Sequence, residues 1–252
     1  MKLVIIGGTG LIGTKLVTKL REHRHEAVPA SPETGVNTLT GAGVAAVLEG
    51  ASVVVDVSNS PSFEEKAVMD FFTTATRKLL EYAAAARVKH YVALSVVGTD
   101  RIDDSPYLRA KSAQETLIRG GGIPYSIVRA TQFFEFVRRI ADEATVGATV
   151  RLPPVLFQPM AADDVATAVA RVAVGVPVNG TVEVGGPQQF RFDELIRQGL
   201  NAYNDPRQVV ADPHARYFGA QLAERSLVPW GDARLGDIRF EEWLGHPALQ
   251  QR

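Results

Sequence analysis

The opening stretch of the chain constrains the fold most, because an apolar run, three spaced glycines and a helical pattern follow one another without a break. Residues 3–6 form a short continuous apolar run, which is typical of a central parallel strand buried on both faces. Gly7, Gly10 and Gly13 then follow at G-x-x-G-x-x-G spacing. From Leu11 the apolar residues recur at helical spacing. This order predicts a strand, a tight turn and a helix.

Each glycine of such a turn answers a different steric demand. The first lets the chain turn sharply, the second lets the backbone approach a pyrophosphate, and the third lets the helix pack closely on the strand. The start of the following helix offers free N–H groups and the positive end of the helix dipole, and such an end binds phosphate. A glycine triplet alone is a weak signal, but its place between a strand and a helix is the context that favours dinucleotide binding.

The loop after the second predicted strand bears on the choice of dinucleotide. That strand covers residues 27–30, and Ser31, Pro32 and Glu33 follow it. A carboxylate in this loop suits the ribose hydroxyl of NAD, whereas basic or neutral hydrogen-bonding groups suit the 2′-phosphate of NADP. Ser31 stands first after the strand and Glu33 comes two residues later. We expect NADP as the cofactor, with NAD as the open alternative.

Strands and helices continue to alternate along the chain. The stretches 52–57, 90–95, 125–129 and 181–184 predict further strands, and helical patterns lie between them. This alternation predicts an α/β fold with a Rossmann-type, doubly wound parallel sheet and right-handed connections. From about residue 145 the pattern loosens. We therefore expect a dinucleotide-binding domain over residues 1–148 and a smaller C-terminal α/β substrate lobe over 149–252, partly interleaved with the first.

Composition excludes several function classes. With 27 basic and 28 acidic side chains the net charge is −1, so no overall field attracts nucleic acid. The absence of cysteine excludes disulfides and cysteine-bound metals, and the five histidines have no ligand spacing. The N-terminal apolar run is too short for a signal peptide or a membrane span. We expect a cytoplasmic protein with no metal and with neither a nucleic-acid nor a membrane partner.

A serine, a tyrosine and a lysine are the candidate catalytic residues. Tyr107 and Lys111 are four residues apart, so a helix that begins at Pro106 places them on one face. Ser95 ends the strand that leads to this helix, and a serine can hold a carbonyl oxygen beside a tyrosine. A phenol is a poor acid at neutral pH, and a nearby ammonium moves its pKa toward the working range. The alternative is a surface tyrosine and a solvated lysine.

Other groups have a structural interpretation beside the functional one. Phe133, Phe134 and Phe136 suit either an apolar substrate pocket or the core. Asp163 and Asp164 are predicted to cap the start of a helix rather than to act as acids. Ser62 with Glu65 has the spacing of a capping box at the start of another helix.

Taken together, the motifs resemble the short-chain dehydrogenase/reductase superfamily, in particular its atypical, NmrA-like members. Residues 7–13 are similar to their phosphate loop and residues 91–98 to their fifth strand. Residues 107–111 with Glu115, then 124–129 and 162–166, match in the same order. The resemblance covers roughly residues 1–190.

This resemblance implies a Rossmann fold, NAD(P) binding and a role for each matched residue. Ser95 would orient the carbonyl, Tyr107 would donate the proton, and Lys111 would bind the ribose and lower the pKa of the tyrosine. The expected cofactor contacts, beside Lys111, are Gly7, Thr9, Gly10, Leu11, Ile12, Gly13, Ser31, Ser58, Asn59, Ala130 and Thr131.

Two hypotheses of function follow. The first is an NAD(P)-dependent oxidoreductase that transfers hydride between nicotinamide and a small carbonyl, alcohol or quinone, with Tyr107 as acid/base. The second is a sensor that binds NAD(P) without turnover and passes its occupancy to a protein partner, as expected of some NmrA-like relatives. Sugar-nucleotide epimerisation is a weaker third hypothesis, because the C-terminal lobe is small. Fold alone does not choose among them.

Overall fold

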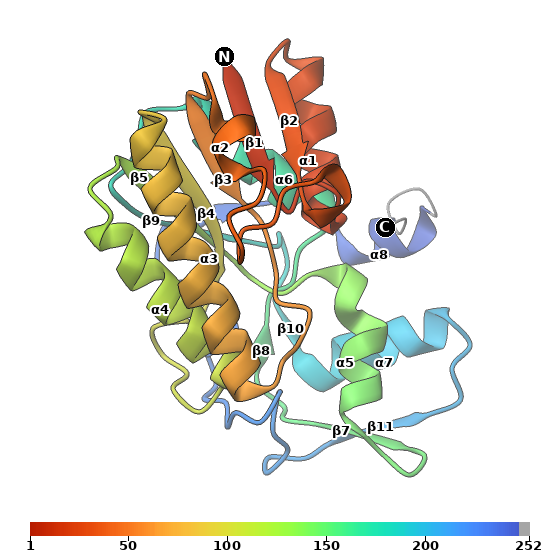
Figure 1. Cartoon of the computed structure of the whole chain (residues 1–252). Helices are drawn as coiled ribbons and strands as arrows, with labels where there is room; N and C mark the ends of the chain where they lie inside the picture. Colours follow the sequence, from red (N-terminus) through yellow and green to blue (C-terminus); the bar gives the residue numbers. More distant parts are fainter. Residues whose placement is uncertain (247–252) are drawn as a thin grey trace.

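The N-terminal apolar run forms the middle of a parallel sheet (Figure 1). In the computed structural model, which describes residues 1–246, β1 (Lys2–Ile6) lies between β2 (Glu26–Ala30) and β3 (Val53–Asp56). The side chains of Leu3, Val4 and Ile5 are fully buried. A strand that is covered on both faces explains why the run is continuously apolar rather than alternating.

Within residues 1–246 the sheet has seven strands in the order β12-β9-β5-β4-β3-β1-β2, and every neighbouring pair is parallel. The remaining strands are β4 (His90–Val96), β5 (Tyr125–Ala130), β9 (Gly180–Gly185) and β12 (Arg234–Leu235). The predicted doubly wound α/β fold is confirmed. The strand order reverses at β1, because β2 lies on one side of it and β3 on the other. Ligands bind at such a reversal, beyond the carboxyl ends of the strands.

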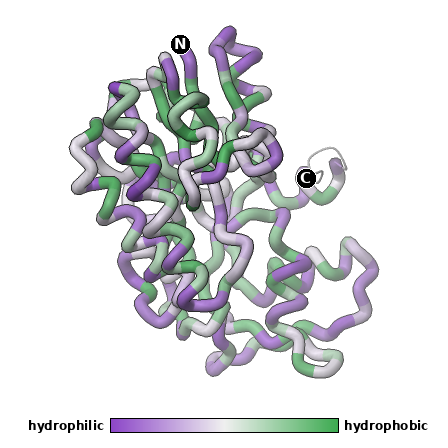
Figure 2. The backbone as a smooth tube through the Cα atoms, viewed as in Figure 1, coloured by the Kyte–Doolittle hydropathy of each residue, from purple (hydrophilic) through white to green (hydrophobic). Residues whose placement is uncertain are grey.

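Helices cover both faces of the sheet. One face is covered by α1 (Leu11–Glu22) and α6 (Ala162–Val174), which pack against each other and the strands. The other face is covered by α2 (Val44–Leu48), α3 (Glu65–Ala85) and α4 (Pro106–Gly120). Figure 2 shows hydrophobic and hydrophilic residues alternating along these helices, as expected of helices with one buried side. Within residues 1–246, no helix combines the length and the hydropathy that a bilayer-spanning segment needs.

Two smaller sheets and their helices lie beyond the carboxyl ends of the main sheet (Figure 1). Strands β6 (Thr145–Val146), β7 (Thr149–Leu152) and β11 (Gln208–Ala211) form one, and β8 (Leu156–Phe157) pairs with β10 (Phe190–Arg191) in the other. They share an apolar core with α5 (Val137–Glu143), α7 (Phe192–Ala202) and α8 (Phe240–Gly245). Two short 3-10 helices, Pro32–Thr34 and Phe134–Phe136, complete the fold.

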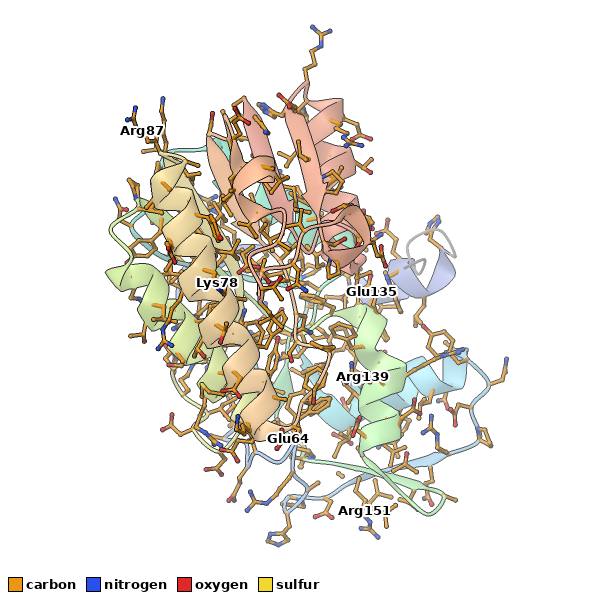
Figure 3. The ribbon with its side chains drawn as sticks, viewed as in Figure 1. Glu64, Lys78, Arg87, Glu135, Arg139 and Arg151 are labelled. Carbon is orange, nitrogen blue, oxygen red and sulfur yellow. The ribbon has the colours of Figure 1, made fainter. Side chains whose placement is uncertain are left out.

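The prediction that Asp163 and Asp164 cap the start of α6 is wrong. The residue before this helix is Ala161, and the carboxylate of Glu135, near the start of α5 (Figure 3), accepts hydrogen bonds from the Ala162 N–H at 3.1 and 3.2 Å. Asp163 instead pairs with Lys15 of α1. Glu135, which is distant in the sequence, thus takes the place of a local cap. Asp163 instead links α6 to α1.

The predicted capping box of α3 is also wrong. Its cap is Glu64, whose side chain accepts a hydrogen bond from the Ala67 N–H at 3.0 Å. Ser62 lies two residues earlier, and its hydroxyl accepts from the Glu64 N–H at 3.2 Å. The serine therefore stabilises the loop before the helix.

Replacement of Gly13 by alanine tests the closeness of α1 to the turn after β1. A Cβ at Gly13 would lie 2.1 Å from the Gly7 carbonyl oxygen, which is backbone and cannot rotate away. We expect Gly13→Ala to lower the free energy of unfolding in urea by about 2 kcal/mol or more. Gly120→Ala, at the open end of α4, is the control and should change it by less than about 1 kcal/mol. Equal effects would contradict the close packing.

Candidate functional site

A cavity of about 680 Å³ opens beyond the carboxyl ends of β1 to β5. It is lined by the turn after β1, the loops after β2, β3 and β5, the end of β4 and the first turns of α4. The structure brings together in its wall the predicted site residues Gly7, Thr9, Gly10, Leu11, Ile12, Ser31, Ser58, Asn59, Ser95, Tyr107, Lys111, Ala130 and Thr131. Gly13 lies behind the turn, where it contacts Gly7, and does not line the cavity.

The turn after β1 leaves backbone exposed to the cavity. Gly7 has a φ of +79°, which side chains rarely adopt. A Cβ at Gly10 would meet only the Gly7 carbonyl oxygen, at 3.4 Å, and would otherwise extend into open space. No side chain of the described residues caps the start of α1, and its first turn holds no acidic residue. The arrangement suits an anion such as a diphosphate.

Three buried polar atoms in the cavity wall have no hydrogen-bond partner among the described residues. They are Ser31 Oγ, Thr131 Oγ1 and Gln132 Oε1. Buried polar atoms are almost always hydrogen-bonded, because burial without a partner is costly. A polar ligand would supply the missing partners, so these residues fit a dinucleotide. Gln132 was not predicted from the sequence, although it directly follows Thr131.

The expected ribose end of the cavity is neutral. Ser31 lines it, while Glu33 is exposed and lies outside the wall. Thr34 turns back so that its hydroxyl accepts a hydrogen bond from the Ser31 N–H at 2.9 Å. The loop therefore offers a hydroxyl but no carboxylate.

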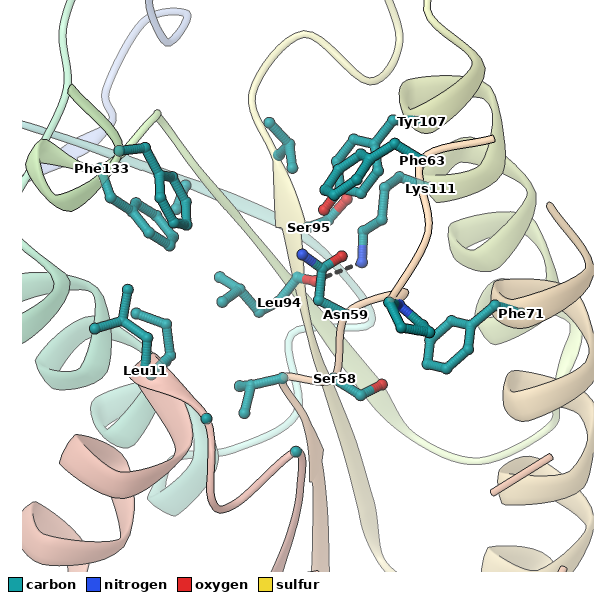
Figure 4. Close-up of a pocket in the computed structure, with 18 of the residues that line it drawn as sticks. Leu11, Ser58, Asn59, Phe63, Phe71, Leu94, Ser95, Tyr107, Lys111 and Phe133 are labelled. Carbon is teal, nitrogen blue, oxygen red and sulfur yellow. Dashed lines mark hydrogen bonds between the residues drawn. The ribbon is translucent and has the colours of Figure 1, made fainter. Parts of the chain in front are cut away.

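Lys111 is held deep in the wall by two acceptors, of which Figure 4 shows the one at Leu94. Its ammonium donates to the Leu94 carbonyl oxygen at 2.9 Å and to the side-chain oxygen of Gln114. Burial lowers the pKa of Lys111 to about 8, although the negative charges of Asp56 and Glu115 oppose this change. Lys111 is thus a poorly hydrated cation that lines the cavity.

Asp56 joins Lys111 to the loop after β3. Its carboxylate accepts from the Gln114 side-chain amide at 3.0 Å and from the Ser58 hydroxyl and N–H at 2.6 and 3.0 Å. Asp56 is 2% exposed, so these bonds form away from water. The chain Lys111–Gln114–Asp56–Ser58 fixes the lysine relative to Asn59, which lies opposite it in Figure 4. The sequence analysis missed the roles of Asp56 and Gln114; a lone acid at the end of an apolar strand was the only signal.

Ser95 is tied to a buried ion pair. Its hydroxyl donates to Glu115 Oε1 at 2.6 Å. Arg129 binds both oxygens of the same carboxylate, at 2.9 and 2.7 Å, and Arg119 binds one of them at 2.8 Å. Burial raises the pKa of Glu115, but the hydrogen bonds from Arg129 and Ser95 outweigh it and lower the pKa below its ordinary value. The Ser95 proton therefore points at Glu115, and the Ser95 oxygen can still accept a hydrogen bond from a ligand in the cavity.

Tyr107 lies half-buried among aromatic rings at the far end of the cavity (Figure 4). Its ring centroid is 5.5 Å from that of Phe63 and 5.9 Å from that of Phe72. Burial raises the pKa of Tyr107, and the positive charge that opposes the rise is Arg139. The expectation that Lys111 lowers this pKa is therefore not met in the structure, since the ammonium is directed at Leu94 and Gln114.

The three clustered phenylalanines divide between cavity and core. Phe133 and Phe136 line the cavity, with ring centroids 5.4 Å apart. Phe134 instead packs against Phe240 and Trp243, at 5.0 and 5.6 Å between centroids. The cavity interpretation therefore applies to Phe133 and Phe136, and the core interpretation applies to Phe134.

A family model described as NAD(P)H-binding matches residues 7–175. The chain belongs to this NAD(P)H-binding family. The matched segment includes the turn after β1, Ser95, Tyr107 and Lys111. The predicted cofactor class, NAD or NADP, is thereby confirmed.

Three solved structures have a fold similar to that of this chain. A UDP-glucose 4-epimerase from Thermotoga maritima, solved with UDP-glucose, is 17% identical with a TM-score of 0.74, over 97% of this chain and 96% of that one. A short-chain dehydrogenase/reductase superfamily protein from Agrobacterium tumefaciens, solved with bound NAD, is 17% identical with a TM-score of 0.73, over 97% of this chain and 95% of that one. A dTDP-4-dehydrorhamnose reductase from Bacillus anthracis in complex with NADP is 15% identical, TM-score 0.67, over 84% of each.

Two curated relatives are photosystem II assembly factors called Ycf39. The protein from Cyanophora paradoxa is 21% identical over 62% of this chain and 55% of its own length. The one from Trieres chinensis is 26% identical over 54% of this chain and 47% of its own length. The matched region therefore spans about half the length of these relatives.

Replacement of Glu115 by glutamine tests the ion pair behind Ser95. The lowered pKa means that the carboxylate stabilises the fold above its unfolded pKa, and that this contribution is lost as the pH falls through the folded pKa. We expect Glu115→Gln to lower the free energy of unfolding at pH 7 by about 3–5 kcal/mol, because it leaves Arg129 short of a partner. In urea titrations the difference from wild type should shrink below about pH 4.

Glu65→Gln is the matched control for this prediction. Glu65 is an exposed partner of Arg109 and should contribute less than about 1 kcal/mol at any pH. An effect of Glu115→Gln as small as that of the control would show that the buried pair does not stabilise the fold.

Proposed function

We propose that this protein is an NAD(P)-dependent oxidoreductase that transfers hydride between nicotinamide and a small carbonyl compound, alcohol or quinone, with Tyr107 as acid/base. One observation carries the proposal. A single cavity joins the glycine turn to a half-buried phenol whose hydroxyl has no hydrogen-bond partner in residues 1–246. Membership of an NAD(P)H-binding family supports the cofactor, and the apolar rings beside Tyr107 favour an apolar substrate.

When bound, the dinucleotide supplies or accepts the hydride. The turn after β1 and the start of α1 would hold its diphosphate, while Ser31 would contact the adenosine ribose. Ser58, Asn59, Ala130 and Thr131 would hold the nicotinamide half, and Lys111 the second ribose. In this role Gln114 and Asp56 are positioning residues, because they fix the ammonium of Lys111.

Tyr107 would deliver the proton to the carbonyl oxygen during reduction. The phenol is protonated at neutral pH and so carries the proton to be donated; burial raises its pKa and weakens it as an acid, and the charge of Arg139 opposes that rise. In the direction of alcohol oxidation the phenolate would be the base, and the nearby Arg139 favours its formation. Aromatic side chains around the hydroxyl would limit the access of water to the reacting atoms.

Ser95 would have a smaller part than Tyr107. To orient a carbonyl by donation, its hydroxyl must first turn away from Glu115, with which it forms a 2.6 Å hydrogen bond. A neutral hydroxyl that leaves a carboxylate gives up a strong, charge-assisted hydrogen bond. The net gain from a new bond to substrate is therefore small.

Paired substitutions test these roles. We expect Tyr107→Phe to reduce kcat by about 10²-fold or more, because general acid catalysis contributes about 10² to 10⁴. Ser95→Ala should reduce kcat by about tenfold or less. The readout is oxidation of NADPH with a panel of apolar ketones and quinones, and dinucleotide affinity should be unchanged in both variants. Full activity of Tyr107→Phe would refute the assignment.

Calorimetric titration with NADP(H) and NAD(H) tests the cofactor. The ribose end has no carboxylate to repel a 2′-phosphate and no cation to attract it, since the charged residues among the described lining residues are Lys111 and Arg139. We expect binding of NADP with NAD accepted at an affinity within about tenfold, which corresponds to about 1.4 kcal/mol. Binding of neither would remove the proposal, and a preference far above tenfold would show a recognition group outside this loop.

A regulatory role is the second candidate, because both curated relatives are described as photosystem II assembly factors. In that case the protein would bind one oxidation state of the dinucleotide tightly, without turnover on the panel, and a protein partner would respond to its occupancy. Activity that depends on Tyr107 would exclude this role as the sole function.

A further inference from the structure

Arg139 is a cation without a counter-ion at the substrate end of the cavity. It lies on α5, toward the loop before α3, and lines the cavity, although its side chain is exposed to solvent. Its guanidinium lies over the Phe63 ring, 4.5 Å from the centroid, and forms no ion pair with any residue in the described part of the chain. Its neighbour Arg138 lies over Tyr203 at 3.8 Å and is outside the cavity wall.

Tyr217 presents a second phenol to the same space. Its ring packs against Phe192 and Phe218, with centroids 5.3 and 4.8 Å away, and its backbone pairs with Ala220. These contacts fix the ring, while its hydroxyl has no hydrogen-bond partner within residues 1–246. Tyr217 was not expected from the sequence, because it lies more than a hundred residues after the candidate catalytic group.

The two phenols and the guanidinium act on one another electrostatically. Burial raises the pKa of Tyr217 and that of Tyr107, and the charge of Arg139 opposes both changes. Tyr107 also raises the pKa of Tyr217, and both tyrosines line the same cavity. Three hydrogen-bond donors thus converge on the cavity, and none of its described lining residues is a carboxylate that could neutralise the cation.

This combination of groups selects the chemistry of a ligand. Arg139 is exposed, and an apolar neutral molecule that covered its guanidinium would remove the charge from water without offering a partner, which is costly. A carboxylate would instead accept two parallel hydrogen bonds from the guanidinium and a third from a phenol. The surrounding rings of Phe63, Phe133 and Phe136 suit an apolar body attached to that carboxylate.

We propose that the substrate is an apolar oxo acid, whose carboxylate binds Arg139 and Tyr217 while its carbonyl group faces Tyr107. This inference rests on the proposed function and narrows its substrate class. In the reduction, hydride adds to the carbonyl carbon and the oxygen takes the proton of Tyr107. The product is a hydroxy acid with its carboxylate unchanged, and the nicotinamide cofactor is oxidised.

Binding to the NADP-saturated protein tests the inference without turnover. The probes are benzoylformate and 4-methyl-2-oxopentanoate, each compared by calorimetry with its uncharged methyl ester. We expect at least one acid to bind tenfold or more tightly than its ester. Arg139→Gln should weaken that acid at least tenfold and abolish the preference, and Tyr217→Phe should weaken it severalfold. Arg138→Gln is the matched control and should retain the preference.

Two results would overturn the inference: no preference for the acid in either pair, or a preference that survives Arg139→Gln. Unchanged NADP affinity and melting temperature in Arg139→Gln would show that the variant is folded and loaded. If the oxidoreductase proposal is wrong and the anion site is correct, the result is different. An acid preference that depends on Arg139 is then present, but neither oxo acid is reduced at the expense of NADPH. Turnover of the neutral panel without any acid preference would leave the oxidoreductase proposal intact and remove the anion site.

Discussion

The contact between α1 and the turn after β1 is the constraint on which the site depends. Gly13 lets the helix approach until the backbone of Gly7 and Gly8 lies where a side chain would be. The N-terminus of α1 is thereby directed at the carboxyl end of the sheet, with its first N–H groups uncapped by any side chain of residues 1–246. A bulkier residue would push the helix away and turn its free N–H groups from the cavity. The anion-binding geometry of this turn therefore depends on the close packing of α1 at Gly13.

Two buried polar networks then hold α4 to the sheet. One runs from Asp56 through Gln114 to Lys111, and the other links Arg129, Glu115 and Ser95. Burying charges is costly, and each network offsets the cost with several hydrogen bonds of good geometry. Both include side chains of α4 and of the strands, so the helix that carries Tyr107 cannot shift without breaking them. These bonds fix the position of Lys111 and of the helix start that carries Tyr107.

The substrate end has a different origin. Phe63 comes from the loop before α3, Arg139 from α5 and Tyr217 from the segment after β11. These segments meet only because the two small sheets fold over the carboxyl ends of the main sheet. Related folds differ in such loops while the sheet is retained, which is why fold similarity identifies the cofactor class more readily than the substrate.

The sequence by itself determined the parallel sheet, the glycine turn, the NAD(P) class and the candidate group Ser95, Tyr107 and Lys111, because these depend on short-range spacing and on runs of buried residues. The tertiary structure decided what surrounds each group. It directed the Ser95 hydroxyl to donate to Glu115 and the Lys111 ammonium to donate to Leu94, and it made Arg139 the charge that lowers the pKa of Tyr107 against the effect of burial. Side-chain partners and the pKa values they set arise from contacts between segments far apart in the chain, and no local pattern encodes those contacts.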